Sequence, residues 1–352
     1  MIDSNRTECE LAYQMNFHPV YRVSQFWSFA VSLIAIPALI SFLLGKVIFL
    51  HFHGNLKCLL NCYFFSILLF SCAMSFGFGF HFFQPFFVTT KCSLIIDPTF
   101  FKWGHLFSMS LLTISMLLPI GFSIERFVAL LMAEKYENVR TLLGPIVVVL
   151  LIGLDLAMVR TVYAKDMFSD VYLSFVLTPT TSTSQVNIYF FSLLAVKIFN
   201  LISNCILIKI HNRVKTRYYR RNNTLSLRYE MEEIIQSSKF TLIISFSHLL
   251  FFGWYIVNTI FVRTFGESIL GGFLNYTVAR GMYCTVPTYS LVIPFIGFKS
   301  LRCLNIQRHN RVQSTVQIKS TGREGARNYE NAISSYWDSI SQGVDRVNRI
   351  DN

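Results

Sequence analysis

Long runs of apolar residues alternate with short polar segments along most of the chain. Seven of these runs are long enough to cross a bilayer, because a transmembrane helix needs about 20 apolar residues. The pattern predicts an all-α membrane protein: a seven-transmembrane helix bundle at 24–298, preceded by an N-terminal segment at 1–23 and followed by a basic tail at 299–352. The predicted spans are 24–50, 58–84, 101–131, 142–163, 187–210, 240–262 and 276–298.

The composition supports a membrane protein. Of the 352 residues, 53% are hydrophobic and 14% are charged, whereas about 25% are charged in an average soluble domain. The net charge of +12 does not indicate nucleic-acid binding, since the basic residues gather in a few loops instead of forming one patch. Most of the 31 Lys and Arg residues fall on one side if the N-terminus is outside, so the positive-inside rule predicts a cytoplasmic C-terminus.

The third span ends on Glu125, Arg126 and Phe127. A charged pair is costly within the bilayer unless it lies at the membrane edge or has a partner. With the N-terminus outside, this triplet falls at the inner end of the third helix, where G-protein-coupled receptors carry an acid-Arg-aromatic switch. The alternative is that both charges merely anchor the helix among the lipid headgroups.

Apolar residues recur at helical spacing between Leu227 and Leu242, which predicts that the sixth helix extends into the cytosol from near Ser226. We assign Arg228 and Glu232 of this extension to the same G-protein switch. Other receptor marks are absent: Trp254 has no Pro two residues later, and the seventh span lacks Asn-Pro-x-x-Tyr.

Several short segments give the chain a resemblance to a narrower family, the nematode serpentine receptors of class beta. The matching residues are Cys9, FHPVY at 17–21, FHGNLK at 52–57, KCSLIID at 91–97, MLLPIGFSIERF at 116–127, LSLRY at 225–229 with Glu232 and Glu233, NRVQSTVQI at 310–318 and YENA at 329–332. The resemblance implies a multi-pass receptor in the plasma membrane or cilium of sensory neurons that signals through a heterotrimeric G protein. It implies no particular ligand.

Two cysteines, Cys9 and Cys92, lie on the predicted outer side. The second outer loop, at 164–186, contains no Cys, so the bridge that many receptors form to that loop is impossible here. Because the cell exterior is oxidising, we predict a Cys9–Cys92 disulfide that holds the N-terminal segment against the top of the third helix; two free thiols are the alternative.

The ligand pocket is predicted among the outer halves of the helices. Lys197 lies inside the fifth span, so its charge needs a carboxylate, a backbone carbonyl or the ligand itself. An anionic odorant such as a fatty acid would satisfy it, and Asp155 is the structural alternative. Three residues share one face of the third helix, and five more are aromatic or polar; these candidates are His105, Met109 and Thr113, with His81, Trp254, Tyr255, Asn258 and Tyr283.

Modification and cofactor signals are few. Asn5 begins an Asn-x-Thr glycosylation sequon on the predicted outer side, and Cys303 is a candidate for palmitoylation beside the inner membrane surface. We predict a short amphipathic helix in the tail, with an apolar stripe from Tyr329 to Val344. No Lys occurs at 278–298, which excludes a retinal Schiff base there, and we predict no cofactor, no metal and no catalytic residue.

Together these signals predict a chemosensory receptor, not an enzyme. It would detect a small odorant or pheromone-like ligand outside the cell and act on a heterotrimeric G protein inside. A transporter or ligand-gated channel, and a receptor-like scaffold without its own ligand, are the alternatives. The sequence leaves the oligomeric state open.

Overall fold

The computed structural model describes residues 2–50, 52–132, 141–221, 225–315, 326–327, 329–331 and 333–334. The side chains of 2–6, 215–231 and 307–315 lie outside that description. The chain divides into two units, Met1–Leu301 and Arg302–Asn352. The architecture below is that of the first unit.

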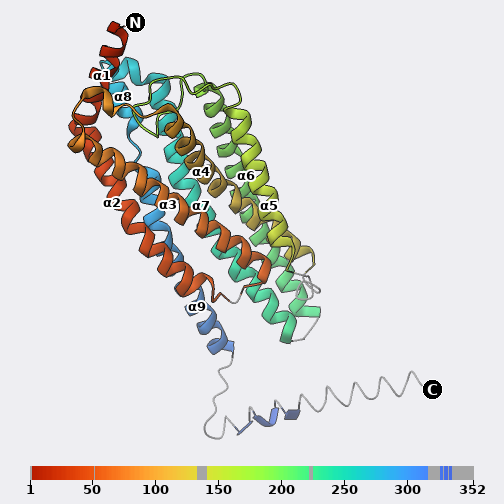
Figure 1. Cartoon of the computed structure of the whole chain (residues 1–352). Coiled ribbons are helices and arrows are strands. Elements are labelled where there is room, and N and C mark those ends of the chain that lie inside the picture. The colour runs from red at the N-terminus through yellow and green to blue at the C-terminus, as the bar shows by residue number, and fades with distance from the viewer. Residues whose placement is uncertain are drawn as a thin grey trace. The chain divides into compact units, whose positions relative to one another are not determined.

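The first unit is a bundle of long helices that lie side by side (Figure 1). Within the described residues, seven helical segments are long and apolar enough to cross a membrane, which confirms the predicted fold class. The elements are α1 (Ile2–Phe17), α2 (Pro19–Phe42) with the π-turn η1 (Leu43–Val47), α3 (Gly54–Phe87), the 3-10 turn η2 (Lys91–Leu94), α4 (Pro98–Leu131), α5 (Leu143–Val162), α6 (Thr183–Arg221), α7 (Leu225–Ile269), α8 (Phe273–Gly281) and α9 (Thr285–Thr315).

Most helices extend beyond the apolar runs that predict them. The start of α7 at Leu225 agrees with the extension predicted from near Ser226. At its C-terminal end, α9 continues as one helix as far as Thr315. The apolar stripe farther along the tail lies largely outside the described residues.

The seventh span is not the continuous helix that the sequence predicts. It is interrupted between α8 and α9 at 282–284, and the backbone of Met282 is extended. Pro287 suits the first turn of α9 because a proline there removes no intrahelical hydrogen bond. Serines of α2 contact the interruption: Ser28 Oγ donates to the Tyr283 carbonyl at 2.9 Å, and Ser24 Oγ lies 3.2 Å from Cys284 Sγ. These contacts are the internal partners that non-helical backbone requires at membrane depth.

Side-chain caps and close contacts fix the central helices. The Asp97 carboxylate accepts hydrogen bonds from the amides of Thr99 and Phe100, both at 2.9 Å, and thereby begins α4. At the start of α5, Gly144 donates to Asn55 Oδ1 at 3.0 Å. A Cβ atom on Gly144 would lie 2.5 Å from the Asn55 carbonyl oxygen, so only glycine permits this approach of α5 to α3.

The helix α1 packs against one end of the bundle, which also carries α8 and the loop between α5 and α6 (Figure 1); we call it the α1 end. A buried cluster there joins Ala12 and Met15 of α1 to Leu94, Leu173 and Val278. On its exposed side, Lys91 Nζ donates to a Glu10 carboxylate oxygen at 2.5 Å, and this hydrogen bond lowers the pKa of Glu10.

A disulfide joins Cys9 of α1 to Cys92 of η2, with 4.5 Å between their Cα atoms. This is the pairing that the sequence predicts. The covalent link fixes the position of α1 against η2, which precedes α4 in the chain.

We expect reduction of this disulfide to destabilise the protein. A loop that joins residues 83 apart in sequence contributes at most about 4.5 kcal/mol in the chain-entropy treatment, and less if the unfolded state keeps its helices. The measurement is the melting temperature of the purified protein with and without reductant. The double variant Cys9→Ser/Cys92→Ser should melt lower than the wild type and ignore the reductant; equal melting temperatures in all four samples would contradict the prediction.

Candidate ligand cavity and polar core

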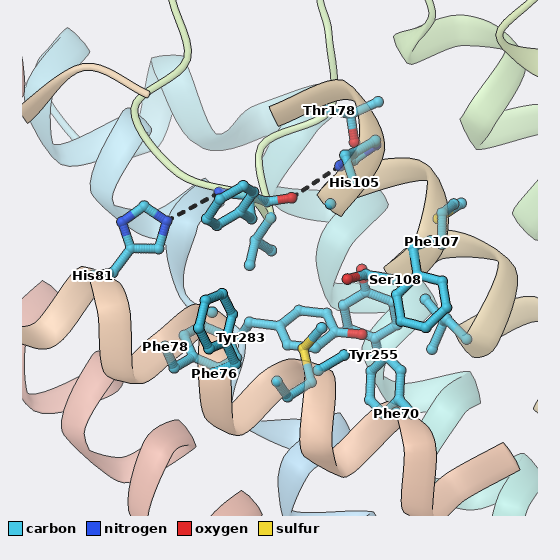
Figure 2. A pocket seen from close by; sticks show the side chains of 18 of the residues that line it. Phe70, Phe76, Phe78, His81, His105, Phe107, Ser108, Thr178, Tyr255 and Tyr283 are labelled. Carbon is cyan, nitrogen blue, oxygen red and sulfur yellow. Dashed lines mark hydrogen bonds between the residues drawn. The ribbon is translucent and has the colours of Figure 1, made fainter. Parts of the chain in front are cut away.

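A cavity of about 310 Å³ lies near the α1 end of the bundle. Its walls come from α3, α4, α6, α7 and the interruption before α9, and the loop between α5 and α6 reaches it as well (Figure 2). Most of the lining is aromatic or sulfur-containing: Phe70, Met74, Phe76, Phe78, Phe100, Phe107, Met109, Phe175, Phe190, Tyr255 and Tyr283. An apolar wall of this kind favours a small, largely apolar ligand.

Two histidines hold the loop over the cavity. The Phe175 amide donates to His81 Nε2 at 3.3 Å, and the Phe175 carbonyl lies 2.8 Å from His105 Nδ1 (Figure 2). A carbonyl only accepts, so Nδ1 of His105 carries the proton, and Nε2 of the neutral ring accepts from the Tyr163 hydroxyl at 2.8 Å. Both backbone groups of Phe175 are therefore fixed by helix side chains.

Arg263 of α7 provides a second attachment for the same loop. Its guanidinium donates to the Thr178 hydroxyl in the loop and to Asn187 Oδ1 in α6, the latter at 2.6 Å. Arg263 also lines the cavity. Its charge is thus directed at protein acceptors on two elements.

The carboxylate of Asp166 organises the outer part of the loop. It accepts from the Thr181 hydroxyl at 2.6 Å, the Ser182 hydroxyl at 2.7 Å and the Phe168 amide at 2.8 Å. Phe168 has a φ of 51°, a left-handed conformation that costs a non-glycine residue about 1–2 kcal/mol. Desolvation raises the pKa of Asp166, but these hydrogen bonds outweigh it, so the pKa lies below its usual value.

Five of the predicted pocket residues line this cavity: His81, His105, Met109, Tyr255 and Tyr283. Trp254 and Asn258 instead line a neighbouring cavity of about 250 Å³, which Tyr255 and Tyr283 share. The structure therefore brings together most of the candidates, on two adjoining cavities.

Two predicted pocket residues, Thr113 and Lys197, line neither of these two cavities. The Thr113 hydroxyl donates to the Met109 carbonyl at 2.9 Å and is buried in α4. Lys197 Nζ lies 2.5 Å from His248 Nδ1, and both side chains are buried. A histidine on α7 thus occupies the position that the sequence assigned to a carboxylate, a backbone carbonyl or an anionic ligand.

The Lys197–His248 pair belongs to a polar core in the middle of the bundle. The His248 ring packs against Phe252 and Tyr289, with centroids 4.0 and 5.1 Å apart, and the Tyr289 hydroxyl hydrogen-bonds that of Tyr63. These contacts join α6, α7, α9 and α3 through aromatic and basic side chains.

A second polar group links α4 to α6. Ser123 Oγ lies 2.6 Å from Asn200 Oδ1 and 2.9 Å from Asn204 Oδ1, while Asn200 Nδ2 donates to the Pro119 carbonyl at 3.4 Å. The asparagines of α6 thus satisfy α4 close to its proline.

The charged pair of α4 is fully buried. Arg126 Nε donates to Glu125 Oε2 at 2.5 Å and Nη2 donates to Oε1 at 2.6 Å, a bidentate arrangement between neighbouring residues. The third nitrogen of the guanidinium, Nη1, donates to the Ser237 hydroxyl of α7. Arg126 therefore ties the ends of α4 and α7 together, which disagrees with charges that only anchor a helix among headgroups.

The remaining residues of the predicted switch differ in environment. Phe127 is exposed and Glu232 is half-buried, while the side chain of Arg228 lies outside the described residues. The sequence does not predict a role for four residues of the site: Ser237, His248, Phe175 and Arg263. His248 could have been found, because a histidine inside an apolar span needs a polar partner, as Lys197 does. Phe175 lies in an irregular loop, and no sequence pattern indicates its role.

The bundle, the cavity near its α1 end and the buried arginine together describe a seven-helix membrane protein. Residues 17–252 match the family described as serpentine type 7TM GPCR chemoreceptor Srb. Three Caenorhabditis elegans proteins are similar to the chain: serpentine receptor class beta-3 is 60% identical over 97% of the chain and 99% of its own length, class beta-12 is 54% identical over 97% and 98%, and class beta-1 is 51% identical over 95% and 98%.

The chain therefore belongs to the Srb family of serpentine chemoreceptors. This confirms the resemblance seen in the sequence and places the chain among multi-pass membrane receptors. The family names do not specify a ligand or a G protein.

We expect acidification to loosen the loop that covers the cavity. Because the pKa of Asp166 is lowered in the folded protein, its contribution is present above the ordinary carboxyl pKa of about 4 and is lost as the pH falls through the folded value. Hydrogen exchange of the amides at 166–182, corrected for intrinsic rates, should accelerate below about pH 4. Asp166→Asn should show the faster exchange already at pH 7 and lose the pH dependence; an unchanged pH profile in that variant would contradict the assignment.

Proposed function

We propose that this protein is a chemosensory G-protein-coupled receptor that detects a small ligand in the cavity at its α1 end. The observation that carries the proposal is the combination of an apolar cavity of about 310 Å³ at one end with a buried Arg126 at the other end of α4. Membership of the Srb family supports the receptor class.

The orientation remains a prediction from charge. With the N-terminus outside, the α1 end with its disulfide faces the exterior, where oxidation is favoured. Arg126 and the extensions of α6 and α7 then face the cytosol and a heterotrimeric G protein. We place the receptor in the plasma membrane or cilium of sensory neurons, with Asn5 available for glycosylation.

The bidentate contact with Glu125 holds Arg126 in the conformation seen here. We infer that this is the silent state, because the bond to Ser237 keeps the end of α7 against α4. Release of Arg126 would require α7 to move, and the space so created would admit the G protein. Cys303 is exposed and is proposed as a palmitoylation site in the tail.

The ligand site is tested by filling the cavity. In cells that express the chain, a panel of small uncharged odorants is screened by calcium imaging, and responses should vanish when nucleotide exchange on G proteins is blocked. Ala73→Leu adds bulk to the cavity wall; since overpacking costs about 1–3 kcal/mol, the half-maximal concentration should rise about tenfold or more.

Ala157→Leu is the matched control for the cavity variant, because Ala157 is exposed on α5 and the same side chain would enter lipid. Its response should equal that of the wild type. Responses that persist without G-protein cycling would favour a channel, and equal sensitivity in both variants would remove the cavity as the ligand site.

The switch is tested by Ser237→Ala, which removes the hydrogen bond between Arg126 and α7 but keeps Glu125. A hydrogen bond to a charged group contributes about 1.5–3 kcal/mol, so ligand-independent signalling should rise about tenfold or more. The control is Ser238→Ala: Ser238 is also buried, and its hydroxyl donates to the Ile234 carbonyl within α7. Equal basal signalling in the two variants, at equal surface expression, would contradict a restraining role for Ser237.

A further inference from the structure

The well-exposed residues of the cavity lining lie on two helices, whereas Tyr255 and Arg263 of α7 and Phe175 and Val176 of the loop are half-buried. Of the residues that line the cavity, three have well-exposed side chains: Phe76 of α3 is 67% exposed, and Phe100 and Phe107 of α4 are 44% and 55% exposed. Ala73 and Gly77 of α3 and Ser108 of α4, which also line the cavity, are half-buried. The cavity therefore reaches the surface of the bundle between α3 and α4.

This opening lies within the hydrocarbon layer of the membrane. A centred helix of 34 residues, such as α3 or α4, is about 51 Å long and extends about 10 Å beyond a hydrocarbon core of about 30 Å at each end. Phe76 lies about 16 Å from the end of α3 at Phe87, and Phe107 lies about 14 Å from the start of α4 at Pro98. Both are therefore deeper than the headgroups.

The loop between α5 and α6 covers part of the cavity at the α1 end. The Phe175 ring lies close to both α3 and α4. A Cβ atom added to Gly104 of α4 would lie 3.1 Å from this ring, and a Cβ atom added to Gly77 of α3 would lie 3.9 Å from it. The Phe175 ring also contacts the Phe100 ring, with centroids 5.2 Å apart. His81 and His105 hold both backbone groups of Phe175 in this place.

The polar groups on the wall suit an uncharged molecule. The guanidinium of Arg263 donates to Thr178 and Asn187, and both ring nitrogens of His105 have protein partners. No carboxylate is among the lining residues to pair with a cationic ligand. The volume is about twice that of a cavity that holds benzene, about 150 Å³.

We propose that the ligand is an uncharged lipophilic molecule that first dissolves in the bilayer and enters sideways between Gly77 of α3 and Ser108 of α4. This inference rests on the proposed ligand site and adds its route and the class of ligand. The bilayer concentrates such molecules, so the receptor would respond to their concentration in the membrane and not to that in water.

The test measures how fast a lipophilic probe reaches the cavity. The full-length receptor in phosphatidylcholine nanodiscs is mixed with 1-azidonaphthalene, an uncharged photoreactive probe, and flashed after increasing delays. Mass spectrometry then quantifies the label on the peptide that contains Met109, and a chase with naphthalene before the flash gives the exit rate.

Gly77→Leu places a side chain in the opening, and its first carbon fits because the nearest atom is 3.9 Å away. The Gly77→Leu variant should slow both entry and exit of the probe by about tenfold or more, because entry and exit cross the same, higher barrier. Gly153→Leu is the matched control, since a Cβ there meets nothing within 4 Å; its rates should stay within about twofold of the wild type. Ser108→Leu narrows the opening from α4 and should reproduce the slowing.

Two results would overturn the route. One is unchanged entry in Gly77→Leu and Ser108→Leu; the other is faster entry in Asp166→Asn, whose loosened loop would reveal an aqueous path. Either result leaves the ligand site intact if the wild type is labelled at Met109 at equilibrium. Absence of that equilibrium label would overturn both the route and the cavity as the ligand site.

Discussion

The bilayer cannot solvate a charged or hydrogen-bonding group, so every such group within the spans must find its partner inside the protein. Arg126 shows how completely this constraint acts here. All three nitrogens of its guanidinium donate to side chains of α4 and α7, although Glu125 and Arg126 are adjacent in sequence. Because removal of any acceptor would leave a buried charge, the ends of α4 and α7 are held to one arrangement.

The same constraint accounts for the middle of the bundle. Lys197 is paired with His248, Tyr63 with Tyr289, and Asn200 with Ser123. Each of these pairs joins two different helices, and together they link α3, α4, α6, α7 and α9. If two of these helices separated, the polar groups that join them would be left without partners in the hydrocarbon layer. The polar core therefore specifies which helices are neighbours.

How much of this was predictable depends on the range of the interaction. The seven apolar runs predict the bundle because length and hydropathy decide whether a segment spans a membrane. The Cys9–Cys92 pair follows from counting the outer cysteines. By contrast, Phe175 and Arg263 act through contacts between a loop and helices that are distant in sequence, and no periodic sequence pattern predicts such contacts. Lys197 was assigned to the ligand because the sequence cannot show that His248 faces it.

The interruption before α9 lies in the chain between a residue of the cavity and a residue of the polar core. Tyr283, within the interruption, lines the cavity, and its carbonyl accepts from Ser28 of α2. Two turns farther on, Tyr289 bonds Tyr63 and packs on His248. A ligand at the proposed site that pressed on Tyr283 would act on the non-helical backbone that precedes Tyr289 in the chain. This break therefore offers a hinge in place of the missing proline of the sixth span, and the polar core lies between that hinge and Arg126.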